Sequence, residues 1–405
     1  MRIKGDLTKG IVWQEFIPAL IVVVNSLTWN TFILSVFSGA INSLKIPSGE
    51  ILLLFSIEFI SIAISAILGS KFFPSSRRAL LALWMAMGSL APILLTTIPN
   101  NGMLINSLVC VFFGISVGAG LPSTLACFAD ATTTENRGFF GGVTFAFVGL
   151  SSIFFVAATI FFGDTIEIAI MTLWRLAGMV LFLATYKIKK TNEEQTAPPY
   201  SNILGQRDFV LYLLPWIMFC MINWIEAPLL ANLFGNLYNL IGFIEVVLAG
   251  ASALIGGIIA DHAGRKRVVM IGFVILGVDY AILSLISGME VAGYVYAILD
   301  SVAWGMFASV FFMTLWGDLG RNQIKEKYYT LGGLPYLLAM FLSELVTPYV
   351  GMMPLGTTFS LAAFFLFLAV VPLMYAPETL PEKKVREREL RDYLEKAKKT
   401  KEKYA

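Results

Sequence analysis

The sequence contains few of the residues that build metal sites and disulfides. Among its 405 residues are three cysteines and one histidine, and only 14% of the residues are charged. The cysteines are widely spaced in or beside apolar segments, so we expect packing residues and no disulfide framework. His262 has no second histidine with which to share a metal ion. We therefore predict neither a metal site nor a cofactor. The cysteines are Cys110, Cys127 and Cys220.

Apolar residues dominate the chain instead. Hydrophobic residues make up 57% of it, which is too apolar and too long for one soluble core. A helix that crosses the hydrocarbon layer needs about 20 apolar residues, and twelve such stretches follow one another. We predict an all-α membrane protein whose surroundings are the lipid bilayer. The first stretch is too long for a cleaved signal peptide and is expected to stay as a helix. The stretches lie at 11–37, 48–69, 79–98, 101–125, 138–163, 166–186, 209–232, 236–260, 268–288, 290–316, 328–350 and 355–376.

The positions of lysine and arginine predict the side of the membrane on which each loop lies. These residues are retained in short loops on the cytoplasmic side. With the N-terminus inside, 27 of the 29 basic residues fall in cytoplasmic segments, Lys45 lies outside and Arg175 lies within a span. We expect a multi-pass protein of the cell membrane with both termini in the cytoplasm. The net charge of +2 does not argue for a nucleic-acid partner, because orientation already explains the basic residues.

A polar interruption divides the spans six and six. It contains KIKK, an acidic pair and Pro198-Pro199, which are typical of a flexible linker. We predict an N-terminal six-helix bundle at 1–186, a cytoplasmic linker at 187–208, a C-terminal six-helix bundle at 209–376 and a charged tail at 377–405. Apolar residues recur at helical spacing in the tail, which fits a helix on anionic headgroups or a solvated charged tail.

Several features recur at one separation of 188 residues, which indicates an internal repeat. Each recurring pair falls in an equivalent cytoplasmic loop. Parallel six-helix repeats have an axis along the membrane normal and a binding site near mid-membrane, where the two halves meet. The pairs are Gly69 with Gly257, Arg77-Arg78 with Arg265-Lys266, and Asp130 with Asp318, while Arg137 falls on Lys325.

The loop after the eighth span carries the most specific motif. It reads GGIIADHAGRKR, and its shortness places its charges against the membrane surface. We expect Gly257 to let two backbones approach closely and Asp261 to face the positive end of a neighbouring helix. We expect Arg265 to pair with a carboxylate such as Asp318. The alternative is that the loop only anchors the topology.

This loop resembles the signature loop of the major facilitator superfamily, Gly-x-x-x-Asp-x-x-Gly-Arg-Lys/Arg, which joins spans two and three and again spans eight and nine. The resemblance implies a conformational latch between the two halves of the chain. The first copy, GSKFFPSSRR, keeps Arg77 but has Phe73 at the aspartate position, which puts the latch from this half in question. The residues of the second copy that match are Gly257, Asp261, Gly264, Arg265 and Lys266.

Two further segments resemble sugar-porter-like members of this family. One runs from Gly114 to Gly138 and ends in a loop that contains Asp130 and Arg137, and the other is APETLPE after the last span. The arginine usual before the first glycine of the fourth span is Cys110 here, and the Pro-Gly motif of drug/proton antiporters is missing from span five. The resemblance implies transport of a small metabolite, disfavours a drug antiporter and leaves sugar specificity open.

Six carboxylates lie away from the ends of the predicted spans, where each is a functional candidate because a charge there is costly. The resemblance implies that spans one, four, seven and ten line a cavity and that spans two, five, eight and eleven form the interface between the halves. On that basis Asp300, Glu58 and Glu245 lead, as groups that load and release a proton. Hydrogen bonds between helices are the alternative role. Asp279 is predicted to be structural, with cation binding as the alternative, and the other two acids are Glu226 and Glu344.

Polar and aromatic residues on the expected cavity spans are candidates for solute binding. Asn amides and Trp rings bind polyols and small organic solutes, although Trp also anchors helices at the membrane surface. Arg175 is predicted to be structural and to need one of the buried acids. The excess of buried acids disfavours a strongly anionic solute. The candidates are Asn25, Trp29 and Asn30 in span one and Asn223, Trp224 and Glu226 in span seven.

Together these features predict twelve helices in two pseudo-symmetric six-helix bundles. The resemblance implies a monomeric secondary transporter that moves a small neutral or cationic organic solute, such as a sugar, by alternating access with protons as the coupled ion. Uniport, or export of a metabolite or drug, is the nearest alternative, and a membrane receptor on the same scaffold is an alternative of another class. The sequence shows no nucleophile and base at membrane depth for an enzyme and no continuous polar helix face for a channel.

Overall fold

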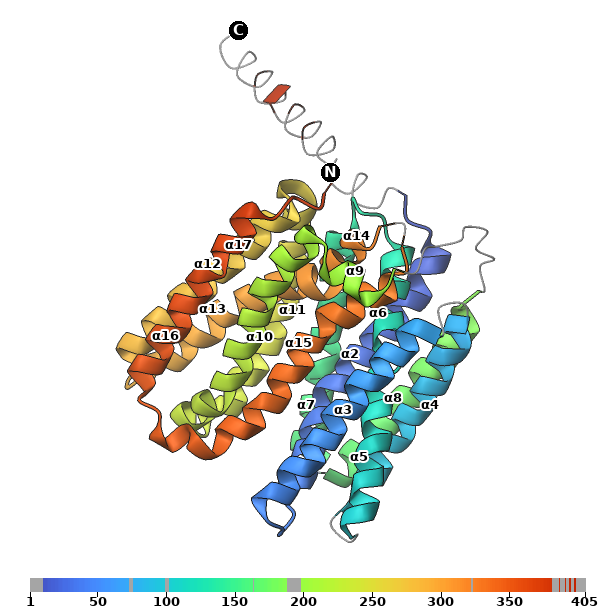
Figure 1. Ribbon diagram of the computed structural model, residues 1–405, viewed down its shortest axis with the longest axis vertical. Coiled ribbons are helices and arrows are strands. Elements are labelled where there is room, and N and C mark those ends of the chain that lie inside the picture. Colours follow the sequence, from blue (N-terminus) through green and yellow to red (C-terminus); the bar gives the residue numbers. More distant parts are fainter. Residues whose placement is uncertain are drawn as a thin grey trace.

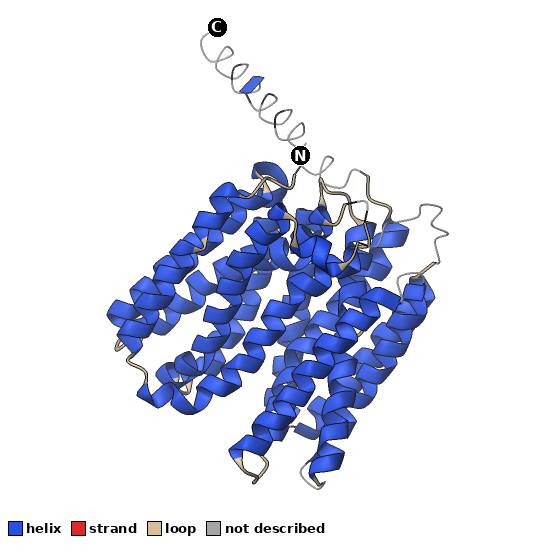
Figure 2. Cartoon of the chain, viewed as in Figure 1, coloured by secondary structure: helices blue, strands red, loops and turns tan. Residues whose placement is uncertain are grey.

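The structure is a computed structural model of the chain. It describes residues 10–72, 76–98, 102–162, 164–187, 198–321 and 323–380, together with five single positions after Leu380. Its regular structure is helical (Figure 2), and twelve helical stretches are long and apolar enough to cross a membrane. Most of the predicted tail helix and residues 188–197 of the linker lie outside the described residues.

The first six spans form the N-terminal bundle. The fourth span consists of two helices because the chain bends at Ala119-Gly120, where Gly120 packs against the ring of Trp84 and leaves no room for a side chain. Pro122 follows in the first turn of the second piece, where a missing N–H costs little. The helices are α2 (Trp13–Asn42), α3 (Ser48–Phe72), α4 (Arg77–Leu95), α5 (Met103–Gly118), α6 (Leu121–Ala131), α7 (Arg137–Phe162) and α8 (Asp164–Thr185).

The last six spans form the C-terminal bundle. Its fourth span contains a π-helical stretch in which Thr314 Oγ1 donates to the carbonyl of Ser309, five residues earlier. Such widened turns occur often at functional sites. The elements are the short linker helix α9 (Tyr200–Leu204), then α10 (Arg207–Phe234), α11 (Leu237–Ala263), α12 (Arg265–Ile286), α13 (Val291–Phe307), η3 (Ala308–Leu315), α14 (Trp316–Leu319), α15 (Lys325–Val346), η4 (Thr347–Met352), α16 (Leu355–Leu368) and α17 (Val370–Tyr375).

The two bundles lie side by side, with α12, α16 and α17 on one side of the view and α4, α5 and α8 on the other (Figure 1). Along their boundary α7 packs against α11 and α3 packs against α15. These are spans five and eight and spans two and eleven, so the predicted interface helices are confirmed. The twelve spans and the two-bundle architecture also agree with the sequence prediction.

Large apolar side chains cover the outside of the bundles. Leu83, Leu104 and Leu285 expose 64%, 76% and 83% of their surface. A helix pairs its backbone polar groups internally, as a hydrocarbon solvent requires. The chain is therefore a multi-pass membrane protein.

Small residues bring α7 and α11 into close contact. A Cβ atom on Gly257 would overlap the carbonyl oxygen of Gly138, and one on Gly142 would overlap the backbone of Ala253. The predicted role of Gly257 in close backbone approach is confirmed. Because these positions have no side chain, two helices of different bundles pack backbone to backbone.

The Gly257→Ala substitution should separate these two helices. The added methyl group has no space against Gly138, and overpacking of this kind costs about 1–3 kcal/mol. We expect a lower thermal midpoint in detergent and a weaker contact between the bundles. Gly242→Ala on the same helix is the control, because a Cβ atom added there would meet nothing within 4 Å. Equal midpoints for the two variants would contradict the tight contact.

Candidate functional site

One end of the molecule, at the top of Figure 1, carries the loops between α3 and α4, α6 and α7, α11 and α12, and α14 and α15. We call this end the charged face. Here Asp261 accepts hydrogen bonds from the backbone N–H groups of Gly138 (3.0 Å) and Phe139 (2.6 Å). These groups belong to the first turn of α7, so the predicted contact of Asp261 with the positive end of a helix is confirmed.

Asp318 joins the two bundles through a buried pair of arginines. Its Oδ2 atom lies 3.3 Å from Arg265 Nε, as predicted, and its Oδ1 atom pairs with Nη1 of Arg137 from the other bundle. The carboxylate is fully buried and Arg137 is 4% exposed at its side chain. Arg265 also pairs with Asp261 at 2.7 Å. This three-way contact therefore holds both bundles together away from water.

The first copy of the motif takes part in an equivalent ionic network, which also joins the two bundles. Arg77 Nη1 lies 2.9 Å from Asp130, and Lys325 Nζ pairs with the same carboxylate. Arg77 Nη2 also lies 2.6 Å from Glu326 of the C-terminal bundle. Although Phe73 replaces the expected aspartate, Glu326 supplies a carboxylate from the facing helix. An ion pair therefore joins the two bundles on this side as well, through Glu326, which was not among the sequence candidates.

The two networks follow the 188-residue repeat. Asp130 pairs with Arg77 of its own half and Lys325 of the other, and Asp318 pairs with Arg265 of its own half and Arg137 of the other. The repeat therefore places one base of each half in the opposite half's network. Contacts of this kind form only when the charged ends of the bundles are together.

Two further contacts stabilise the charged face. Glu378 accepts from the backbone N–H groups of Arg265 (2.9 Å) and Lys266 (3.2 Å), so it caps the first turn of α12. Gly264, directly before this turn, has a φ of 105°, and a Cβ atom added there would overlap Glu378, so the position requires glycine. In the linker, the Tyr200 hydroxyl meets Ser70 of α3, and burial raises the pKa of Tyr200, which keeps its hydroxyl neutral.

Three half-buried aromatic residues, Trp224, Trp304 and Tyr336, lie near the middle of their helices. We call them the aromatic cluster. The indole N–H of Trp304 donates to Asn223 Oδ1 at 3.0 Å. The rings of Trp224 and Trp304 lie 5.3 and 6.1 Å from Tyr336, in edge-on arrangements. Nε1 of Trp224 is buried without a partner among the described residues. Trp304 and Tyr336 were not among the sequence candidates.

Four carboxylates gather in the C-terminal bundle, and we call them the acid cluster. They come from four successive helices, α10 to α13. Tyr280 lies within electrostatic reach of all four, and Asp300 of both Glu245 and Asp279. Glu226 lies close to Tyr280. No salt bridge joins any of them to a described Lys, Arg or His. The acid cluster consists of Glu226, Glu245, Asp279 and Asp300.

Burial leaves the acid cluster short of hydrogen bonds. Asp279 is fully buried and neither of its carboxylate oxygens has a partner among the described residues. Asp300 and Glu226 are 2% and 3% exposed, and each has one oxygen without a partner there. The acid cluster adjoins the aromatic cluster, because Asp300 lies one helical turn before Trp304 and Glu226 one turn after Asn223.

Glu58 and Glu344 lie on opposite sides of the boundary between the bundles. Glu58 is 2% exposed on α3, is within electrostatic reach of Glu344, and has one oxygen without a partner among the described residues. Glu344 on α15 accepts a hydrogen bond from Ser38 of α2 at 3.0 Å. The structure therefore places Glu58 apart from Glu245 and Asp300, with which the sequence analysis had grouped it.

The candidates on α2 lie inside the N-terminal bundle. Asn25 donates to the carbonyl of Trp174 at 2.6 Å and accepts from Arg175 at 3.2 Å. Trp29 is fully buried, and Asn30 is 8% exposed. Asn25 and Trp29 therefore pack against α8 in this structure, which favours a role in holding the bundle together.

The prediction that Arg175 needs a buried acid is wrong for the described residues. Its guanidinium lies between the rings of Trp29 (4.7 Å) and Trp84 (4.1 Å), and it donates to Ser26 at 2.8 Å. No described carboxylate pairs with it. Cation–π contacts take the place of an ion pair, because two indole faces attract the guanidinium in a desolvated site.

The cysteines and potential metal ligands add no further site. Cys110, Cys127 and Cys220 are buried free thiols, as predicted for packing residues. Within the described part of the chain, no three His, Cys, Asp or Glu side chains lie in an arrangement suited to a metal ion. This finding includes the acid cluster.

Comparison by sequence finds no matching family model and no matching curated protein. Comparison by structure does find matches. The proton:xylose symporter XylE of the major facilitator superfamily, bound to 6-bromo-6-deoxy-D-glucose, matches with a TM-score of 0.69 at 12% identity, over 93% of this chain and 97% of XylE. The major facilitator superfamily transporter FucP, in the outward conformation, matches with a TM-score of 0.63 at 11% identity, over 90% of this chain and 98% of FucP.

These likenesses extend over nearly the whole of each chain. At such low identity they concern the backbone arrangement and carry no statement about solute or coupling. They agree with the two six-helix bundles, the 188-residue repeat and the signature loop. The chain has the fold of the major facilitator superfamily.

Proposed function

We propose that this protein is a secondary transporter that moves a small organic solute across the cell membrane by alternating access, without changing it chemically. The observation that carries the proposal is the pair of ionic networks that join the bundles at the charged face. In this proposal the charged face is cytoplasmic, and the structure represents a state closed on that side. Breaking the networks lets the bundles rock and opens the cytoplasmic side.

The aromatic cluster is the proposed wall of the solute site. It lies at mid-helix on spans seven, ten and eleven, two of which line the cavity in this fold. Trp224 and Tyr336 offer ring faces, and the Trp224 indole N–H offers a donor without a protein partner among the described residues. Rings with nearby donors suit a neutral or cationic solute such as a sugar or polyol. XylE, which shares the fold, is named as a xylose symporter.

The acid cluster is the proposed coupling site. Buried carboxylates without basic partners are stable only when protons or a cation neutralise them. Asp300 of the acid cluster lies one helical turn from Trp304 of the aromatic cluster, on α13. Solute binding and neutralisation of Asp300 therefore affect the same helix. We propose proton symport, with Asp300 and Glu245 as the first groups to exchange protons. Glu58 is a further candidate at the boundary of the bundles.

A binding screen followed by an uptake assay tests the proposal. Purified protein is screened by thermal shift against sugars, polyols, amino acids, organic cations and carboxylates, at one acidic and one neutral pH. A solute at about 100 times its Kd adds about 2.7 kcal/mol of stability. We expect a neutral or cationic compound to stabilise the protein, and we expect an inside-alkaline gradient to concentrate it in proteoliposomes. A bound compound that never crosses the membrane would contradict transport and favour a receptor.

A further inference from the structure

A cavity opens on the charged face between the two bundles, close to the ionic networks. It has a volume of about 310 Å³. Its N-terminal wall comes from the loop between α6 and α7, which includes Thr133, Thr134 and Arg137. Its C-terminal wall includes Arg321 and Lys325, between α14 and the first turn of α15. A molecule bound in this cavity would therefore touch both bundles at once.

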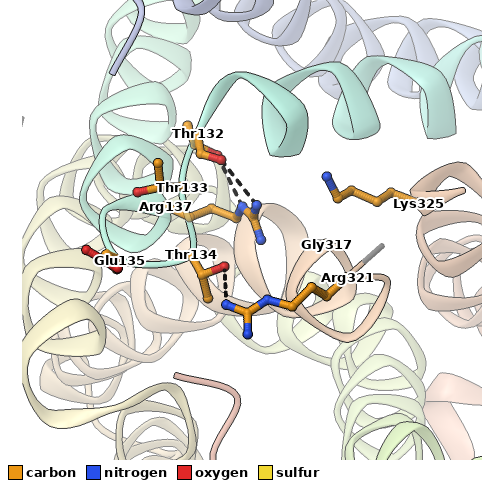
Figure 3. Close-up of a pocket in the computed structure, with 8 residues that line it drawn as sticks. All are labelled: Thr132, Thr133, Thr134, Glu135, Arg137, Gly317, Arg321 and Lys325. Atoms are coloured by element: carbon orange, nitrogen blue, oxygen red, sulfur yellow. Dashed lines mark hydrogen bonds between the residues drawn. The ribbon is translucent and has the colours of Figure 1, made fainter. Parts of the chain in front are cut away.

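The cavity presents three cationic groups to the same space (Figure 3). Arg137 and Lys325 already pair with Asp318 and Asp130. Arg321 forms no salt bridge with a described carboxylate, and its Nη2 atom donates to Thr134 Oγ1 at 3.0 Å. The remaining N–H groups of Arg321 have no carboxylate partner among the described residues, so they can donate to an anion in the cavity.

Hydroxyl groups complete the lining. Thr133 and Thr134 both lie in the lining, and the hydroxyl of Thr133 points away from the cationic groups (Figure 3). Thr134 Oγ1 accepts from Arg321, so its own proton is free to be donated. The carboxylate in the lining, Glu135, lies on the side away from Lys325 (Figure 3). Arginine, lysine and the Thr134 hydroxyl around one space match the oxygens of a phosphate group, which takes bidentate bonds from a guanidinium.

We propose that this cavity is a regulatory site for a phosphate-bearing anion, which binds only while the charged face is closed. The walls come from different bundles, so the cavity exists as a site only when the bundles meet there. A ligand that binds one of two states shifts the population towards that state. The anion therefore holds the cytoplasmic side shut and slows transport, and its release permits opening. The regulation adds to the proposed transport and does not define it.

Inorganic pyrophosphate is the probe, and distance labels report the state of the charged face. Labels on cysteines placed at Gln14 and Arg267 lie on different bundles, and the three native cysteines are buried. In phosphatidylcholine nanodiscs, pyrophosphate should increase the short-distance population in a saturable manner. Arg321→Gln should raise the half-maximal concentration by about tenfold, the scale of one charge-assisted hydrogen bond. Arg207→Gln, an exposed charge outside the cavity, is the matched control.

The source of the phosphate is resolved by repeating the measurement in phosphatidylglycerol nanodiscs without pyrophosphate. A short-distance population that Arg321→Gln removes there supports the site with a lipid headgroup as its ligand. A saturable effect of pyrophosphate alone supports a soluble ligand. The site would be overturned by the absence of both a pyrophosphate effect in phosphatidylcholine and an Arg321-dependent short-distance population in phosphatidylglycerol. Equal losses in Arg321→Gln and Arg207→Gln would also overturn it. Failure of solute uptake with an intact pyrophosphate effect would instead count against the proposed transport.

Discussion

Replacing Asp318 with asparagine should open the cytoplasmic side of the protein. The carboxylate is fully buried and serves Arg137 of one bundle and Arg265 of the other. Its loss leaves buried guanidinium groups short of a counter-ion, and breaking a buried pair costs about 3–5 kcal/mol. At about 1.4 kcal/mol per decade, the ratio of closed to open protein should fall by about two to four orders of magnitude. Distance labels on the charged face should report long distances, and solute uptake should fall with them.

The control for this variant is Asp130→Asn at the repeat-related position. Asp130 pairs with Arg77 and Lys325, but its side chain is 31% exposed. Water screens such a pair, so its loss should cost no more than about 1 kcal/mol. Asp130→Asn should therefore change the distance distribution far less than Asp318→Asn. Equal distributions in the two variants, with both proteins folded by thermal unfolding, would show that burial of Asp318 does not set the strength of the closed contact.

The second large effect is expected at the acid cluster. Asparagine at Asp300 cannot exchange a proton, so in Asp300→Asn uptake should continue down a solute gradient but lose its dependence on an imposed pH gradient. Asp279→Asn should have a similar effect, because Asp279 is fully buried and both of its oxygens lack partners among the described residues. The measurement is solute accumulation in proteoliposomes with and without the gradient.

Two further variants make this test specific. Glu290→Gln removes an exposed carboxylate immediately before α13 and should leave coupling intact. Glu58→Gln tests the role of the carboxylate at the boundary between the bundles independently of the acid cluster. Coupling that survives in Asp300→Asn, Asp279→Asn and Glu245→Gln but is lost in Glu58→Gln would move the coupling site to the boundary. Sodium-driven uptake in place of proton-driven uptake would keep the cluster as the coupling site but change its ion.

The sequence was sufficient to predict the membrane fold. The length of each apolar stretch predicts a helix that spans the membrane. The recurrence of Arg77 and Asp130 as Arg265 and Asp318 indicated two similar halves. The signature loop predicted the contacts of Asp261 and Arg265 correctly, because they are made by residues of one motif and the helix beside it. Contacts of this kind can be predicted from the linear sequence.

Contacts between distant segments were harder to predict. Glu326 replaces the carboxylate missing at Phe73, but it lies on a different helix, and nothing in the sequence near Arg77 indicates it. Asp279 was predicted to be structural because its span is peripheral, and the structure brings it within electrostatic reach of Asp300. Arg175 lacks a described acid because two tryptophans from α2 and α4 enclose it. In each case the direction of a side chain around its helix decided the outcome.

The most direct test of alternating access follows both faces of one protein at once. Labels at Gln14 and Arg267 report the charged face, and labels at the exposed positions Lys45 and Met289 report the opposite face. Addition of the transported solute with a proton gradient should lengthen one distance while shortening the other, in the same molecules. Distances that stay fixed on both faces during uptake, or that lengthen together, would contradict alternating access.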